Sequence, residues 1–470
     1  MHRSSCLLPF VSACALCLSG VALPASAQTG GSVAQAAGVA SNPLSFDDGR
    51  LVFDVHFNTR LEIRDNTTDF NAAINAPNDA AWLLTRFRLG ALFEPTDYLK
   101  LYVQGQDIRE LGGSRPNNVG AFGADGDDVF DVLRAWLWLG KESGPSLQVG
   151  RQELNYGDQR LLGNPQWLNS SRAWDAIRFH YITDDWFLDL FTGSRVTFVN
   201  NRWNQSDYFN THEGRNAFDS GLYFSSKTLV PWQNATDFYL LNFNFNKTPT
   251  ASGAPLGQTG DCNVWTLGTR MKGDPSKLHQ WDYELEVAAQ LGRAAGLDQR
   301  AFAGHWGFGY NIDHAWKPRV GVQYNYATGD NDPTDGRNTT FINGFPGNHD
   351  LYGFMDTTAW MNMHNPQLNI RLQPTENLKL TLNYNLYWNA TNNDGWFAAN
   401  TSTLIRPVNA AATAASQFRG QEFDINAYYK LGTHFSAQAG YSIFLPGSYL
   451  AQTGASDTAH LGYLQLTVNF

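Results

Sequence analysis

The chain has 470 residues and a formal charge of −10; 43% of its residues are hydrophobic, 14% aromatic and only 16% charged. Soluble domains carry about 25% charged residues, so this chain is poor in charge. Its mean hydropathy of −0.36 nevertheless shows that it is not strongly hydrophobic overall. This composition excludes intrinsic disorder and fits strands that have one apolar and one polar face.

The first residues predict export from the cytoplasm. Met1–Arg3 form a short basic start, Leu7–Leu23 is mostly apolar, and Ala25–Ala27 has the A-x-A pattern of a signal-peptidase site. We therefore expect residues 1–27 to be a signal peptide and the mature chain to begin at Gln28.

Removal of this leader leaves Cys262 as the single cysteine and gives a charge of −11, because 32 basic and 43 acidic side chains remain. No intramolecular disulfide is then possible, so stability must come from backbone pairing and burial. The acidic balance also argues against a nucleic-acid partner. An alternative processing site, Val11-Ser12-Ala13 before Cys14, loosely resembles a lipoprotein box, but apolar sequence continues well past it.

Apolar and polar residues alternate strictly along much of the mature chain, and no apolar run approaches the roughly 18 residues of a membrane-spanning helix. The clearest stretches are Leu51–Arg64, Leu83–Glu94, Trp281–Gly292 and Leu378–Asn389. A period of two predicts strands with unlike faces, which occur both in soluble sandwiches and in membrane barrels.

The lengths of the connections favour a barrel. Short links (95–98, 141–145, 183–185 and 373–377) alternate with long Gly-, Asn- and Asp-rich stretches (110–129, 155–173, 329–357 and 391–419). Short turns at one end and long loops at the other are typical of outer-membrane barrels, and this pattern gives about 18 strands. We predict an all-β fold, a transmembrane antiparallel up-and-down β-barrel over residues 48–470, after a flexible periplasmic lead-in of residues 28–47.

The end of the chain supports the same fold. Leu464, Leu466, Val468 and Phe470 alternate with polar residues, and a terminal aromatic strand resembles the signal read by the barrel-assembly machinery. We therefore expect that machinery, through Phe470, and outer-membrane lipid as partners. The last strand must pair with the first, because an open edge in lipid leaves backbone groups without hydrogen bonds.

Tryptophan and tyrosine residues cluster near the predicted strand ends. We expect them to form rings at the two membrane interfaces. They are Trp82, Tyr98, Trp138, Tyr181, Trp186, Tyr310, Trp316, Tyr326 and Trp388.

If the apolar positions face lipid, the polar positions of the same strands face the lumen. The acidic residues placed there are Asp54, Glu62, Asp189, Asp282, Glu284, Glu286, Glu422 and Asp424. The basic set is larger: besides Lys100 and Arg319, it holds our candidate pore-lining and anion-binding residues, Arg60, Arg64, Arg86, Arg88, Arg134, Arg178, Arg270, Lys272, Arg371 and Lys379. An inner face richer in basic than acidic residues is informative in a chain of net negative charge.

The first two strands bring Arg60, Arg64, Arg86 and Arg88 to similar height, where like charges repel unless an anion or a carboxylate intervenes. Charged rings of this kind select anions, and the planar guanidinium binds carboxylate through two hydrogen bonds. The alternative is that the arginines pair with lumen carboxylates and only rigidify the wall. Both can hold together, with the acidic stretch 282–286 on the far side producing a transverse field.

Three segments carry a resemblance to a known family: Gly150–Leu161, Phe345–Asp356 and Gly440–Leu450. From about Leu51 to Phe470 the sequence resembles the alginate-export family of outer-membrane barrels. The resemblance implies an 18-stranded barrel that exports an anionic uronate polysaccharide through an arginine-lined constriction, with loops acting as lids. The constriction is not carried over residue by residue.

Arg151 lies in the first of these segments, but alternation places it with Leu147 and Val149 on the lipid side. A bulge at Gly150 would turn it inward, since glycine inside a strand often marks a bulge. Arg151 is therefore not among our candidate residues.

These observations predict an outer-membrane channel that passes an anionic, alginate-like polysaccharide or its oligomers by facilitated diffusion. The mixed charge of the lumen leaves an alternative, a general nutrient porin without preference for uronates. An enzyme or an adhesin built on a plugged barrel is the least favoured reading.

We expect no enzymatic activity and no cofactor. The sequence has no G-x-S-x-G, and His212, His349 and His364 have no serine and carboxylate at a recognisable spacing. We also expect no metal: the acidic loop of Asp330, Asp332 and Asp335 only superficially resembles a calcium loop, because Gly336 falls one place late and Pro333 interrupts it.

Overall fold

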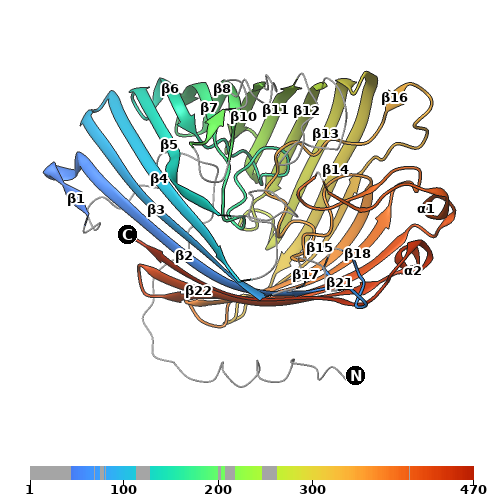
Figure 1. The fold of residues 1–470 in the computed structure, drawn as a ribbon. Helices are drawn as coiled ribbons and strands as arrows, with labels where there is room; N and C mark the ends of the chain where they lie inside the picture. The colour runs from blue at the N-terminus through green and yellow to red at the C-terminus, as the bar shows by residue number, and fades with distance from the viewer. Residues whose placement is uncertain are drawn as a thin grey trace.

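The computed structural model describes residues 44–67, 69–74, 79, 81–112, 127–198, 203–206, 218–245, 262–401 and 403–470. The expected signal peptide and residues 28–43 of the expected lead-in lie outside these ranges. The described chain forms a closed antiparallel barrel of 18 strands, as predicted (Figure 1).

The barrel strands follow one another around the wall in chain order. They are β2 (Leu51–Asp65), β3 (Ala81–Thr96), β4 (Leu99–Leu111), β5 (Asp128–Gly140), β6 (Gly144–Gln152), β7 (Trp174–Ile182), β8 (Trp186–Thr197), β10 (Phe218–Ser226), β11 (Gln233–Phe245), β12 (Cys262–Gly273), β13 (Trp281–Ala294), β14 (Leu297–Asn311), β15 (Arg319–Ala327), β17 (Met363–Leu372), β18 (Leu378–Asn389), β21 (Phe418–Leu431), β22 (Phe435–Pro446) and β23 (Ala459–Asn469).

The remaining elements are short and lie in the connections. They are β1 (Ser45–Phe46), the 3-10 turn η2 (Asp47–Gly49), β9 (Gln205–Ser206), β16 (Arg337–Asn338), β19 (Trp396–Phe397), β20 (Leu404–Arg406), α1 (Ala410–Ala414) and α2 (Ser448–Thr453). Within the described ranges, no helix is long and apolar enough to cross a membrane.

The barrel closes between its last and first strands. Strand β23 pairs antiparallel with β2, with Val468 opposite Phe57 and Leu464 opposite Leu61. The terminal Phe470 continues the ladder through two backbone bonds with Val55, of 2.9 and 3.1 Å. Closure removes both sheet edges, which is the condition that hydrocarbon imposes on a strand that crosses it.

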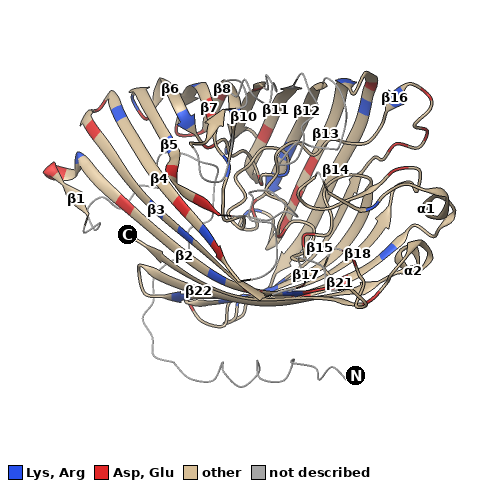
Figure 2. Cartoon of the chain, viewed as in Figure 1, with Lys and Arg blue, Asp and Glu red and all other residues tan. Residues whose placement is uncertain are grey.

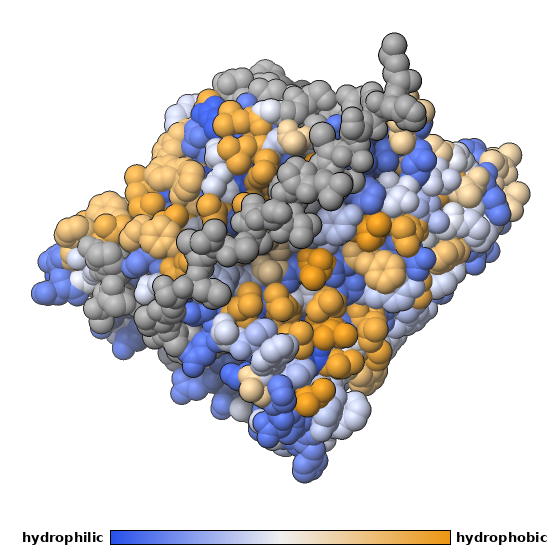
Figure 3. Space-filling model, turned by 90° about the horizontal axis from the view of Figure 1, so that it is seen from below, coloured by the Kyte–Doolittle hydropathy of each residue, from blue (hydrophilic) through white to orange (hydrophobic). Residues whose placement is uncertain are grey.

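The two faces of the strands sort as the alternation predicts. On β7, Ile177 and Tyr181 point outward and are 52% and 39% exposed. Arg178 and His180, which lie between them in the strand, are buried on the inner face. The same sorting holds around the wall, and Figure 3 shows apolar side chains gathered across one outer face with hydrophilic ones toward its margins.

Short turns and long loops separate to opposite ends of the barrel, again as predicted. The links 97–98, 141–143, 183–185 and 373–377 join neighbouring strands at the end where β2 begins and β23 finishes, which is the periplasmic end of such barrels. One connection at the opposite end departs from the rule. Strands β13 and β14 are joined by only Ala295 and Gly296, both with positive φ (53° and 82°), as a tight two-residue hairpin requires.

The prediction of an aromatic belt holds only in part. Tyr98 and Trp316 are 58% and 51% exposed, near the short turns. Trp82 and Trp138 instead belong to the inner face and are buried, and Trp138 stacks on the His180 ring with 4.7 Å between centroids. Position near a strand end does not choose between the two faces, whereas alternation does.

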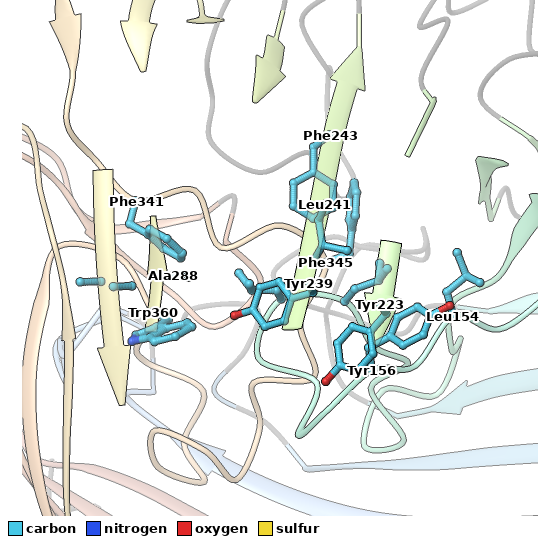
Figure 4. Close-up of a cluster of buried hydrophobic side chains, with 14 of the residues drawn as sticks. Leu154, Tyr156, Tyr223, Tyr239, Leu241, Phe243, Ala288, Phe341, Phe345 and Trp360 are labelled. Atoms are coloured by element: carbon cyan, nitrogen blue, oxygen red, sulfur yellow. The ribbon is translucent and has the colours of Figure 1, made fainter. Parts of the chain in front are cut away.

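The largest hydrophobic cluster lies inside the barrel. It joins two long connections, which we name the first inner loop (residues 153–173, between β6 and β7) and the second inner loop (residues 328–362, between β15 and β17), to the inner faces of the strands. Figure 4 shows Tyr156 of the first loop and Phe345 and Trp360 of the second among side chains of the wall, such as Tyr223 and Phe243. The molecule therefore packs its core within its own lumen.

Candidate channel lumen

The two inner loops meet inside the barrel in a strand-like contact. The amide of Gly163 donates to the carbonyl of Phe345 at 2.9 Å, and the amide of Phe345 donates to the carbonyl of Leu161 at 2.8 Å. Arg172 fixes this contact, because its Nη1 donates to the carbonyls of Gly163 (2.7 Å) and Phe345 (2.6 Å). The loops thus form one body rather than two independent lids.

A second contact between the loops is aromatic. The rings of Trp167 and His349 stack with centroids 3.8 Å apart and planes 9° from parallel. The guanidinium of Arg60, on β2, lies 3.7 Å from the centroid of the same Trp167 ring. His349 Nδ1 lies 3.0 Å from a carboxylate oxygen of Asp356 within the second inner loop. This stack ties both loops to the barrel wall.

The arginines of the first two strands bind the first inner loop. Arg60 Nη1 donates to the carbonyl of Trp167 at 2.7 Å. Arg86 Nη1 donates to the carbonyls of Gln166 and Leu168 at 3.1 and 2.9 Å. Both arginines are nearly fully buried, at 1% and 4% exposure. The group that intervenes between these cations is therefore largely the polypeptide backbone.

Their neighbours are also held by partners of the wall. Arg60 and Arg64 share Glu62, at 2.6 and 2.9 Å. The buried Arg88 donates to the side-chain oxygen of Gln106 at 2.7 Å. Glu62 thus serves as the carboxylate that the alternative reading of this cluster requires for two of the four arginines.

The first inner loop binds the opposite wall through ion pairs. Asp158 lies 3.0 Å from Arg270 and 2.8 Å from Lys272, both on β12. Arg160 lies 3.0 Å from Glu284 and 3.3 Å from Glu286, both on β13. Since β12 and β13 stand across the strand order from β2 and β3, the loop bridges the lumen from wall to wall.

These ion pairs keep Asp158 charged. Burial alone would raise the pKa of Asp158, but Arg270 and Lys272 offset it and hold the pKa well below its usual value. The acidic stretch 282–286 is neutralised in turn, because Asp282 binds Arg319 at 2.8 Å. The expected transverse field is therefore compensated locally.

Other candidate residues pair with nearby groups of the wall. Arg178 lies 3.0 Å from Asp189, which also contacts the ring of His180 at 2.7 Å. Arg134 donates to Gln104 at 2.9 Å, and its guanidinium lies 3.6 Å from Glu153. Arg270 makes a further pair with Asp237, and Lys100 binds Glu94 and Glu142. Figure 2 shows the basic and acidic residues interspersed along the strands.

Arg371 and Lys379 differ from the rest of the set. Both are exposed, and neither forms an ion pair within the described part of the chain. Register places Arg371 opposite Thr381, two residues from Lys379, on the inner face of neighbouring strands. Lys379 follows the turn 373–377, so this pair lies toward the end of the short turns.

Arg151 remains on the outer face, and the bulge that would have turned it inward is absent. The register of β6 with β5 and with β7 runs through Gly150 without a shift. Arg151 Nε donates to Asp175 at 2.8 Å, and Asp175 shares the outward face of β7 with Ile177. The positive φ of Gly150 (121°) is accommodated within the ladder.

Sequence reasoning missed the loop residues that fill the lumen. They are Asp158, Arg160, Trp167, Arg172 and His349. Three of them, Asp158, Arg160 and His349, lie within the segments Gly150–Leu161 and Phe345–Asp356, which carry the family resemblance. The resemblance could therefore have pointed to these residues. What alternation lacks is any rule for loops, because it assigns faces only to strands.

The acidic loop near Gly336 shows ordinary turn chemistry. Asp332 accepts hydrogen bonds from the amide and hydroxyl of Thr334, at 3.1 and 2.6 Å, and Asp335 accepts from the amide of Arg337 at 2.8 Å. Among the residues that the structure describes, no group of three or more His, Cys, Asp or Glu side chains is arranged to hold a metal ion.

Solved structures with the same fold include three proteins of Pseudomonas aeruginosa, of which OpdK is an outer-membrane protein. OpdK matches with a TM-score of 0.59 at 9% sequence identity, over 89% of this chain and 98% of its own. OccK9 (OpdG) matches with a TM-score of 0.59 at 12% identity, over 89% and 98%. OccK11 (OpdR) matches with a TM-score of 0.54 at 11% identity, over 89% and 96%. No curated protein matches the chain.

At these low sequence identities, the solved structures establish only the fold. The family is established by the sequence of the chain. The family model described as alginate export matches residues 50–463, which is nearly the whole barrel. Together with the closed barrel, this match places the chain in the bacterial outer membrane. The match identifies the chain as a member of the alginate export family, a group of outer-membrane channel proteins.

Proposed function

We propose that this channel passes an anionic, uronate-type polysaccharide or its oligomers by facilitated diffusion, and that basic residues of the lumen attract the polymer. Membership of the alginate export family supports a polysaccharide as the substrate. Carboxylate groups repeat along such a polymer, and guanidinium and ammonium groups bind carboxylate through charge-assisted hydrogen bonds.

The observation that carries the proposal is the pair Arg371 and Lys379. Both are exposed on the inner face near the periplasmic end, and within the described ranges no carboxylate forms an ion pair with either. Arg319 lies directly opposite Arg371 in the ladder, but Asp282 already neutralises it. Two cations without an ion pair among the described residues favour, at this mouth, the entry of an anionic chain from the periplasm.

Further along the lumen, two other candidate cations keep part of their side chain open. Arg134 and Lys272 are 27% and 32% exposed. Each touches a carboxylate, so each offers a site that exchanges partners rather than a fixed trap. Conduction needs binding strong enough for entry and weak enough for release. The buried arginines Arg60 and Arg86 act through the first inner loop that they hold. Arg88 acts on the loop through Gln106, which donates to the carbonyl of Ser170.

The test is ion selectivity and block in planar bilayers. We expect the wild-type channel to select anions and to be blocked by oligouronates. The double variant Arg371→Glu, Lys379→Glu should move the reversal potential toward cations and weaken the block about tenfold, because each lost contact between exposed ions contributes about 0.2–1 kcal/mol. Lys277→Glu is the matched control: Lys277 is 52% exposed in the turn between β12 and β13, at the same end.

A general nutrient porin is the second candidate. The lumen also presents partly open carboxylates, with Asp158 and Glu284 each 22% exposed. One of the barrels of similar fold, OpdK, has a crystal structure with vanillate. Equal permeation of neutral and anionic sugars, with no block by oligouronates, would favour this function over the first.

A further inference from the structure

A pocket opens on the outer face of the barrel, away from the lumen. It has a volume of about 370 Å3 and is lined by Asp131, Val132, Ala135, Arg151, Asp175, Trp203 and Asn204. Its floor is the pair of Arg151 and Asp175, which point outward from β6 and β7. No step of the proposed transport uses these residues.

The connection that follows β8 forms one side of the pocket. Strand β9 pairs with the end of β8. Asn204 just before it is bonded three ways: its amide to Asp131 (2.5 Å), its side chain to Asp128 (2.7 Å) and its carbonyl to Arg151 (3.1 Å). The neighbouring Trp203 is held at the rim with 70% of its surface exposed. A large aromatic side chain is thus presented outward from a fixed backbone.

The pocket replaces apolar surface that other strands supply. Outward apolar residues of β14 run from Phe302 to Tyr310, about 26 Å along the strand, whereas those of β7 run only from Ile177 to Tyr181, about 13 Å. The next outward residue of β7 is Asp175. Since an outward apolar band is about 25 Å tall, the pocket lies at the depth where other strands still face the outer leaflet.

The charges of the lining decide which headgroup fits. Two carboxylates, of Asp131 and Asp175, face one guanidinium, so the lining is negative overall. Each nitrogen of the Arg151 guanidinium already has a partner, Asp175, Asn204 or the carbonyl of Val132. A phosphate would meet repulsion from the two carboxylates, and the one guanidinium among the described lining residues already has its partners. Hydroxyl and amide N–H groups can donate to the carboxylates, and an aromatic face suits a sugar ring or the first acyl carbons.

We propose that this outer-face pocket binds the headgroup of a saccharolipid, a lipid built on acylated amino sugars, through its hydroxyl and amide N–H groups, with Trp203 packed against the sugar ring. Asp175 is the principal acceptor, and Arg151 positions it. The bound lipid completes the apolar band where β6 and β7 leave it short.

The test is native mass spectrometry of the purified, detergent-solubilised barrel with three added lipids: diphosphoryl lipid A, monophosphoryl lipid A and phosphatidylglycerol. We expect both forms of lipid A to bind alike and phosphatidylglycerol to bind far less. Trp203→Ala should lower the lipid A-bound fraction about fivefold, as loss of one aromatic contact predicts. Asp175→Asn should lower it as well. The matched control is Trp316→Ala, because Trp316 is 51% exposed in the turn between β14 and β15.

Folding is checked separately by heat-modifiable migration on gels. Trp203 is exposed, so Trp203→Ala keeps the proposal testable if Asp175→Asn fails to fold. Three results would overturn the proposal: binding that requires the second phosphate, equal binding of phosphatidylglycerol, or identical lipid retention by the Trp203→Ala and Trp316→Ala variants.

Discussion

The first inner loop touches two opposite walls of the barrel, and the chemistry of the two contacts differs. On the β2–β3 wall, arginines bind neutral carbonyls of the loop, as Arg86 does with Gln166 and Leu168. On the β12–β13 wall, charges of the loop bind charges of the wall, as Arg160 does with Glu284 and Glu286. At the first contact the loop contributes neutral carbonyls, whereas at the second its charges cancel those of the wall.

The difference teaches that the number of basic residues in a lumen does not give the field that a substrate meets. A buried cation that serves loop carbonyls attracts an anion only if the loop leaves. A cation paired with a carboxylate contributes little at a distance, because the two fields cancel. Under the proposed function, we therefore expect the cations that act on a passing polymer to be exposed ones such as Arg371 and Lys379.

We expect the largest effect on stability and conductance at the β12–β13 wall, where charges of the loop pair with charges of the wall. Arg160→Met removes a guanidinium that is only 4% exposed and leaves Glu286 buried beside it. Breaking a buried ion pair by removing one partner costs about 3–5 kcal/mol, so we expect the free energy of unfolding to fall by about 3 kcal/mol. The loop should also leave the β12–β13 wall, which raises mean conductance and channel noise. Urea unfolding in lipid vesicles and single-channel recording measure the two effects.

Arg300→Met is the matched control for this substitution. Arg300 is exposed on β14, so its loss should change neither stability nor conductance by a measurable amount. If Arg160→Met and Arg300→Met gave the same unfolding curve and the same conductance, the ion pairs would not be what holds the first inner loop.

A substitution at the β2–β3 wall, where arginines bind loop carbonyls, should have a weaker effect. Arg86→Met removes two hydrogen bonds to loop carbonyls, which are neutral groups. An unsatisfied buried polar group costs about 1–3 kcal/mol, so the loss of stability should be smaller than for Arg160→Met. The same unfolding and conductance measurements apply. A larger effect of Arg86→Met than of Arg160→Met would reverse the comparison of the two walls.

Much of the fold could be predicted from the sequence, because a two-residue period is a local property. The stretch Leu378–Asn389 coincides with strand β18, and the terminal strand closes on β2 as the need for an unbroken ladder requires. The exception at Ala295 and Gly296 lay outside the prediction, because no physical rule demands a long loop at every position of one end.

The site could be predicted only as far as the faces of the strands. Alternation places Arg86 and Arg270 on the inner face, but it is silent on what each meets there. Their partners, the carbonyl of Gln166 and the carboxylate of Asp158, come from a loop whose path depends on packing across the whole barrel. Contacts between residues so far apart in sequence have no local signature.

The smallest expected effect is that of low pH on the ion pairs between Asp158 and the β12–β13 wall. Arg270 and Lys272 lower the pKa of Asp158 in the docked loop, whereas a free aspartate has a pKa of about 3.9. A depressed pKa contributes stability that is present above that free value and is lost as the pH falls through the docked value. We therefore expect the contribution of Asp158 to docking to be constant from about pH 7 to pH 5 and to weaken only below about pH 4.

Hydrogen exchange of the loop amides around Asp158, followed against pH, measures this docking. Asp158→Asn should flatten the acid response while costing less at neutral pH than Arg160→Met, because Arg270 keeps Asp237 and Lys272 keeps Glu284. An acid response in Asp158→Asn equal to that of the wild type would assign the titration to other carboxylates. The charged wall would then hold the loop through Arg160 alone, and the two walls would differ by one residue rather than by a network.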